Sequence, residues 1–112
     1  MVELNTKGAI MEITSKNINE TLYVYFNGEL DEHNATYTRN YLDKLFQELN
    51  FKRVVLDLYG MDFVDSTGVG VLIGRYKKLK ESNRPIYISN PSTHAEKIFI
   101  MSGLYQIMPK IN

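Results

Sequence analysis

Cysteine is absent from this chain of 112 residues, and histidine occurs only twice. Without cysteine the protein has no disulfide, no thiol nucleophile and no cysteine-based metal site. The two histidines, His33 and His94, lie far apart in the sequence and do not form an HExxH-type pattern. We therefore expect neither thiol chemistry nor a zinc site.

The sequence also lacks long hydrophobic runs and an excess of charge. No apolar run approaches the ~20 residues that a membrane-spanning helix needs, and the N-terminus lacks the apolar core of a secretory signal. The 13 basic residues balance the 13 acidic ones, so no overall basic field attracts nucleic acid or an anionic membrane. We expect a cytoplasmic protein that binds neither nucleic acid nor membrane directly.

The length suits a single domain, since it allows one hydrophobic core and is too short for two. The 44% hydrophobic and 23% charged residues are ordinary for a soluble globular protein. Residues 1–10 show little pattern, and the first strand-like alternation begins at Met11. We expect an N-terminal arm or extension over residues 1–10 and one domain over residues 11–112.

The hydrophobic pattern predicts a hairpin followed by alternating helices and strands. Strands are expected over 11–15, 21–30, 53–58 and 86–89, and helices over about 34–49, 67–82 and 90–103. The nearly continuous apolar run at 53–58 is typical of a strand covered on both faces. This strand, the helix after it and strand 86–89 form a crossover unit, which predicts a parallel pair. One sheet with helices packed on it is the economical architecture.

Several residues have the character of helix ends. Asn34 can cap the first helix. Thr93 and Glu96 have the spacing of a capping box at the start of the third helix, and Gly103 is placed to end that helix in a left-handed turn. Residues 105–109 then either add an edge strand or pack as a tail.

The stretch DSTGVG at 65–70 stands at the junction between an acidic turn and the second helix. Its glycines do not match the dinucleotide fingerprint, and the lysine of a P-loop is missing, so a phosphate cradle is weakly supported. A serine nucleophile lacks a nearby base, and Asp31, Asp62 and Asp65 would oppose a developing oxyanion. The remaining interpretations are a helix cap at Ser66 or Asp65 and a modification site.

Phosphorylation of Ser66 is compatible with a role in capping. A phosphate would add about −1.5 to −2 charges there, and the start of a helix tolerates an anion because its N–H groups and dipole favour one. We therefore interpret Ser66 as both cap and switch. Its phosphorylation should change partner binding more than the fold.

Four fragments resemble the bacterial anti-sigma factor antagonists of the STAS-domain family: FNGELD at 26–31, VVLDL at 54–58, MDFVDSTGVGVLIGRYK at 61–77 and MSGLYQI at 101–107. The likeness extends over about residues 11–108 and is greatest to members that act in sporulation. Its most specific part is the D-S-[ST]-G-[VL]-G core. The resemblance implies an α/β fold, a mixed sheet of four to five strands with three or more helices packed mainly on one side.

The resemblance also implies a regulator that is not an enzyme. Such a protein binds an anti-sigma factor that is also a serine kinase, and thereby releases the sporulation sigma factor. The kinase phosphorylates the serine after the motif aspartate, here Ser66, and a serine phosphatase restores the active form. ADP or ATP would bind to the partner kinase, so no cofactor is expected on this chain. The alternatives are a general-stress or other partner-switching antagonist of the same family, or a small anion- or nucleotide-binding domain.

The resemblance and the residue pattern together predict a partner-binding surface at Asp31, Asp65, Ser66, Thr67, Gly68, Val69 and Arg75. Thr67 stands where close relatives carry serine or threonine, so it is not the expected phosphate acceptor. Arg75 and Lys78 share one side of the helix and either contact an acidic patch of the partner or form a solvated basic face. We expect the free protein to be a monomer.

Overall fold

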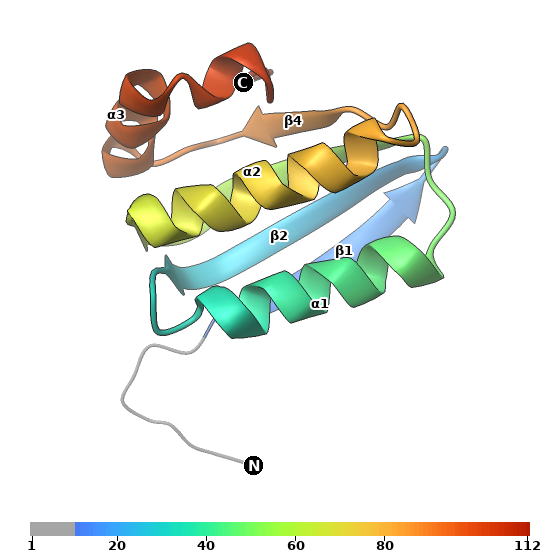
Figure 1. Ribbon diagram of the computed structural model, residues 1–112, viewed down its shortest axis with the longest axis horizontal. Helices are drawn as coiled ribbons and strands as arrows, with labels where there is room; N and C mark the ends of the chain where they lie inside the picture. The colour runs from blue at the N-terminus through green and yellow to red at the C-terminus, as the bar shows by residue number, and fades with distance from the viewer. Residues whose placement is uncertain (1–10) are drawn as a thin grey trace.

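The computed structural model describes residues 11–112 (Figure 1). A hairpin of two strands comes first, helices and strands then alternate, and a short 3-10 helix follows the last α-helix. The elements in order are β1 (Glu12–Ile18), β2 (Thr21–Leu30), α1 (Ala35–Glu48), β3 (Arg53–Val64), α2 (Ser66–Lys80), β4 (Ile86–Ser89), α3 (Thr93–Ser102) and η1 (Leu104–Gln106). The predicted order of elements is confirmed.

Residues 11–112 form one four-stranded sheet with the order β1-β2-β3-β4. β1 pairs antiparallel with β2, whereas β2 with β3 and β3 with β4 are parallel. Figure 1 shows α1 and α2 side by side over one face of the sheet, and α3 beside β4. The predicted α/β class, the mixed sheet and the placement of helices mainly on one side are therefore confirmed.

Strand β3 is longer than predicted. The sequence suggests a strand over 53–58 and then an acidic turn, but β3 continues to Val64 and pairs with β2 as far as Leu30. The turn prediction is wrong because pairing with β2 keeps the chain extended. Gly60 allows the two strands to approach there, since a Cβ atom at Gly60 would lie 2.5 Å from the carbonyl oxygen of Phe26. Register shifts in the pairing near this point absorb the irregularity.

The prediction that strand 53–58 is covered on both faces also needs correction. Helices α1 and α2 cover only one face of the sheet. The apolar side chains of this strand on the opposite face are therefore not buried by these helices. Val55 points to the face without these helices, yet it is buried, and its neighbours across the strands are Tyr23 and Tyr87. Aromatic side chains of the sheet itself thus shield it.

The hydrophobic core lies between the sheet and the helices. Strands β2, β3 and β4 present alternate apolar side chains to it, and α2 contributes Val69, Leu72 and Leu79, as the spacing predicts. Ile73 and Tyr76, also predicted to be buried, are partly buried and pack against the edge of this core. The amphipathic pattern therefore identifies the face of α2 that packs on the sheet.

The predicted cap of α1 is confirmed in position only, and the capping box predicted at Thr93 and Glu96 is wrong. Asn34 is the N-cap of α1 but makes no capping bond, because its amide donates to the carbonyl oxygen of Glu29 at 2.8 Å. The N-cap of α3 is Ser92 rather than Thr93, and its hydroxyl accepts from the backbone N–H of Ala95. Gly103 ends α3 in the left-handed conformation, with φ of 74°, as predicted.

The C-terminal segment follows the edge of β4. After η1, Lys110 forms an isolated parallel bridge with Ile88, and the N–H of Ile88 donates to the carbonyl oxygen of Pro109 at 2.9 Å. Residues 105–109 therefore do not form the predicted edge strand. They complete η1 and a turn that buries Met108, as in the tail alternative, and the bridge to β4 follows at Lys110. Within residues 11–112, no helix is long and apolar enough to cross a membrane.

The parallel pairing of β2 and β3 brings their C-terminal ends together. Leu30 and Val64 are paired at this end of the sheet. The chain leaves β2 through a short loop into α1, and leaves β3 directly into α2. Side chains on the loop at 31–34 and on the first turn of α2 therefore meet at one end of the molecule.

Candidate functional site at the start of helix α2

Asp65 caps helix α2. One of its carboxylate oxygens, Oδ1, accepts from the backbone N–H of Gly68 at 2.9 Å, as an N-cap residue does with a first-turn donor. The other oxygen, Oδ2, accepts from the backbone N–H of Glu32 at 3.2 Å. Asp65 therefore ties the start of α2 to the loop after β2. Of the two caps that the sequence suggests, Asp65 is the one observed.

Ser66 is the first residue of α2 and is exposed. The interpretation of Ser66 as a cap is wrong, because Asp65 precedes it and already occupies that role. Neither Ser66 nor the exposed Thr67 makes a side-chain hydrogen bond to another residue in the part of the chain that the structure describes. The Ser66 hydroxyl is consequently accessible and not committed to holding the helix.

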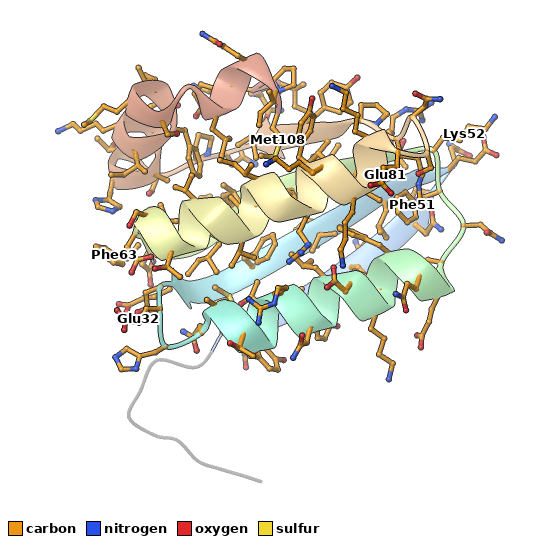
Figure 2. All side chains as sticks on the ribbon, in the orientation of Figure 1. Glu32, Phe51, Lys52, Phe63, Glu81 and Met108 are labelled. Atoms are coloured by element: carbon orange, nitrogen blue, oxygen red, sulfur yellow. The ribbon has the colours of Figure 1, made fainter. Side chains whose placement is uncertain are left out.

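The loop between β2 and α1 places Asp31 at the same end of the molecule. Its Oδ1 atom accepts from the backbone N–H groups of His33 at 3.0 Å and Asn34 at 3.1 Å, which closes a tight turn. Figure 2 shows Glu32 of this loop and Phe63 at the end of β3 on the same side of the molecule. Asp31, Asp65 and Ser66 therefore belong to one local site.

This end of the molecule is acidic. Asp31, Glu32, Asp62 and Asp65 come from the two neighbouring loops and the end of β3, and none of them takes part in an ion pair with another residue of 11–112. No group of three or more His, Asp or Glu side chains is placed to hold a metal ion within the same residues. The acidic character is available to an external partner.

Gly68 is buried where α2 crosses the end of β2. A Cβ atom at this position would lie 2.3 Å from the carbonyl oxygen of Leu30 and 2.8 Å from side-chain atoms of Leu30 and Val64. The glycine is therefore needed for close approach of helix and strand. Its backbone N–H is already bound to Asp65, so this glycine gives little support to an anion-binding site.

Two other residues of the predicted partner surface are mostly covered. Gly68 has no side chain to offer, and Val69 is only 7% exposed. Of the predicted set, Asp31, Asp65, Ser66 and Thr67 are accessible at this end. Gly68 and Val69 are buried, and they pack beneath the accessible residues. A partner can therefore contact Gly68 and Val69 only through the small part of their surface that is exposed.

Arg75 does not lie on the partner-facing surface. Its side chain is 7% exposed, and its Nε atom lies 3.0 Å from Oδ1 of Asp43 on α1. Lys78 approaches the other oxygen of Asp43 at 3.2 Å. Burial lowers the pKa of Arg75, and the nearby Asp43 partly opposes this effect. The expectation that Arg75 contacts a partner is thus contradicted by its burial between the two helices.

His94 is part of the site and was not predicted to be. Its Nε2 atom lies 3.0 Å from the carbonyl oxygen of Val64, and its ring stacks on Phe63 with centroids 4.7 Å apart. Because a carbonyl only accepts, Nε2 carries the proton in this contact. His94 thereby fastens the first turn of α3 to the strand end just before Asp65 and Ser66. The sequence offers no signal for it, since thirty positions separate the two partners.

Comparison with known proteins identifies the family. A model of the STAS domain matches residues 12–112. The chain is 31% identical over 99 residues to an anti-sigma F factor antagonist of Paenibacillus polymyxa, covering 88% of this chain and 85% of the relative. It is 32% identical over 85 residues to an anti-sigma F factor antagonist of Lysinibacillus sphaericus, covering 76% and 73%. An anti-sigma-B factor antagonist of Staphylococcus aureus is 27% identical over 81 residues, covering 72% and 74%.

Solved structures agree with these relatives. The anti-sigma factor antagonist SpoIIAA in its unphosphorylated form superposes with a TM-score of 0.74 at 25% identity, covering 90% of this chain and 89% of that one. The Bacillus cell fate determinant SpoIIAA in the phosphorylated form gives a TM-score of 0.66 at 26% identity, covering 90% and 92%. Sequence and structure thus point to one group of proteins, and the chain belongs to the STAS-domain family, among relatives that are anti-sigma factor antagonists.

Proposed function

We propose that this chain is a partner-switching anti-sigma factor antagonist whose switch is Ser66. In the unphosphorylated form it binds an anti-sigma factor that is also a serine kinase, and so releases the sporulation sigma factor. Phosphorylation of Ser66 by that kinase ends the binding, and a serine phosphatase restores it. The chain acts as substrate and regulator and catalyses no reaction itself.

The exposed hydroxyl of Ser66 carries this proposal. It stands at the first position of α2 without a structural hydrogen bond to another described residue, while Asp65 performs the capping. A kinase can therefore reach the hydroxyl without unfolding the helix. The related SpoIIAA structure in its phosphorylated form supports a phosphate acceptor in this family.

The position of Ser66 explains how a phosphate would act on binding. A helix start accommodates an anion through its N–H groups and dipole, so the fold should persist. The added charge of about −1.5 to −2 would stand among Asp31, Glu32, Asp62 and Asp65 and change the surface that a partner meets. Solvent screening keeps the cost of this repulsion small for exposed groups.

The first test is phosphorylation by the anti-sigma factor kinase of the source organism with ATP. Mass spectrometry should find one phosphate on the wild-type protein and none on Ser66→Ala. The matched control is Thr67→Ala, which removes the neighbouring exposed hydroxyl and should be phosphorylated like the wild type. Equal phosphorylation of Ser66→Ala and wild type would show that Ser66 is not the acceptor.

A second test separates surface from fold. Ser66→Asp should keep the circular dichroism spectrum and the unfolding midpoint of the wild type but lose affinity for the kinase. If Ser66→Asp unfolds, a switch confined to the surface is ruled out.

The choice between a sporulation and a general-stress partner is tested by measuring binding to an anti-sigma F and an anti-sigma B factor side by side. We expect tighter binding to the former, in line with the closer identity to the anti-sigma F antagonists.

A further inference from the structure

An apolar groove lies beside Ser66, between the start of α2 and the end of α3. Its lining residues are Ser66 and Val69 of α2 and Ile98, Met101 and Ser102 of α3, and its volume is about 260 Å³. Figure 1 shows that these two helix ends lie at the same side of the molecule. The groove is thus continuous with the exposed hydroxyl of the proposed switch.

The groove is not filled by the protein's own core. Helix α3 turns Ala95 and Phe99 into the core, where both are fully buried. Ile98 and Met101, three residues apart, lie on another face of the helix and reach the groove. Met101 is 83% exposed, so its side chain contributes little to the folded state. An exposed methionine next to a recess is typical of adaptable binding surfaces.

We infer that this groove receives an apolar side chain of the anti-sigma factor, an inference that rests on the proposed function. A partner that covers Ser66 also covers the groove, because Ser66 forms part of its wall. The volume is below the ~300–1,000 Å³ of pockets that hold drug-sized ligands. One aliphatic or aromatic side chain is therefore a better match than a cofactor.

The groove also explains how one phosphate prevents binding without refolding. A phosphate on Ser66 would stand at the wall of the groove, where it needs water around its oxygens. Docking an apolar side chain there would remove that water without providing hydrogen-bond donors, which is costly for a charged group. The unphosphorylated hydroxyl carries no such charge. The apolar contact and the phosphate are therefore mutually exclusive at one position.

Binding of variants to the anti-sigma factor kinase of the source organism, measured by calorimetry in the presence of ADP, tests this inference. Met101→Gln keeps the length of the side chain but makes it polar, and it should weaken binding about tenfold, as for a central interface residue. Met101→Leu, which stays apolar, should restore most of the affinity. Ile98→Ala, the second groove variant, should weaken binding in the same direction.

Ile100→Gln is the matched control. Ile100 lies on the same helix, is 62% exposed and does not line the groove. Its replacement should leave the affinity unchanged. Because Met101 and Ile100 are both exposed, neither change should lower the unfolding midpoint, which is measured for each variant.

Phosphorylation kinetics give an independent readout. Met101→Gln leaves Ser66 intact, so it should raise KM for the antagonist as kinase substrate with kcat nearly unchanged, the pattern of lost ground-state binding. If Met101→Gln and Ile98→Ala bind like the wild type while the wild type is phosphorylated at Ser66, the groove inference is overturned and the proposed function stands. If the wild type neither binds the kinase nor is phosphorylated, both are overturned.

Discussion

A single carboxylate, that of Asp65, holds two elements at the site. It accepts from Gly68 in the first turn of α2 and from Glu32 in the loop before α1. Because both acceptor atoms are used for structure, the neighbouring Ser66 hydroxyl has no structural task. The residue before the proposed phosphate acceptor therefore determines that the acceptor is accessible.

Replacing Asp65 tests whether this residue, and not Ser66, caps helix α2. Asp65→Ala should lower the free energy of unfolding by about 1–2 kcal/mol, since it removes an N-cap and a loop contact. Asp65→Asn retains an acceptor oxygen for Gly68 and should lose less. Urea unfolding followed by circular dichroism measures both, with the exposed Asp62→Ala as control. An Asp65→Ala variant as stable as the wild type would contradict the capping role.

Gly68 and Gly70 make a matched pair of helix glycines. Gly68→Ala would place a Cβ atom 2.3 Å from the carbonyl oxygen of Leu30, so α2 must shift, at a cost of about 1–3 kcal/mol. Gly70 has open space around its Cβ position, and Gly70→Ala should instead stabilise the helix by about 0.5–1 kcal/mol. Thermal unfolding should give shifts of opposite sign, and equal shifts would refute the close approach at Gly68.

At the scale of elements, a buried ion pair joins α1 to α2. Arg75 Nε and Asp43 Oδ1 approach to 3.0 Å, but the two groups are not aligned as a hydrogen bond. The attraction is therefore mainly coulombic, and it offsets the cost of burying the guanidinium. This pairing removes Arg75 from the surface and fixes the helix whose start carries Ser66.

Removing one partner of this pair should be costly. Asp43→Ala leaves the Arg75 charge buried without its carboxylate and should lower the free energy of unfolding by about 3 kcal/mol. Lys78→Ala removes the exposed partner of the same carboxylate and should cost less than about 1 kcal/mol. The double variant Asp43→Leu with Arg75→Met should recover much of the loss. Denaturant unfolding of the three variants checks the order, and similar losses for Asp43→Ala and Lys78→Ala would argue against a buried pair.

At the scale of the whole molecule, a polar cluster closes the C-terminal end of the fold. The carboxylate of Glu96 on α3 accepts hydrogen bonds from the hydroxyl of Tyr105 in η1 and from Lys110. Lys110 in turn lies at the bridge to β4. The Tyr105 hydrogen bond is the main reason why the pKa of Glu96 is lowered, and burial is the main reason why the pKa of Tyr105 is raised.

These shifts predict a loss of stability at both ends of the pH range. The lowered pKa of Glu96 contributes stability above its usual value of about 4.3, which is lost as the pH falls below it. The raised pKa of Tyr105 contributes stability below the usual value of about 10, which is lost as the pH rises above it. Tyr105→Phe should remove the part of the alkaline loss that ionisation of Tyr105 causes, and it should reduce the acidic loss. Urea midpoints across this range measure the effect, and an unchanged alkaline profile in Tyr105→Phe would contradict it.

The local pattern predicts much of the fold because secondary structure depends on near neighbours. The apolar spacing identifies the buried face of α2, and Gly103 marks the end of α3 because only few residues accept a left-handed turn. The length of β3 was not predictable in this way. It depends on pairing with β2, whose residues lie more than thirty positions earlier.

The site also combines features that a local pattern predicts with features that depend on packing between distant segments. Asp31, Asp65 and Ser66 were predicted at one end, and parallel strands do bring them there because their C-terminal ends meet at one edge. His94 and the groove at Met101 were missed, since both arise from the packing of α3 against distant residues. Arg75 was predicted on the surface because sequence charge does not reveal a partner such as Asp43 on another helix.

The sequence by itself determined the order of strands and helices, the family resemblance and the position of Ser66 at the start of a helix, because these depend on residues close in the chain. Only the tertiary structure decided that Asp65 also binds the loop after β2, that Arg75 is buried, and that an apolar groove lies beside the hydroxyl. These features are contacts between distant segments. Their existence depends on how the sheet and helices pack, which no local pattern specifies.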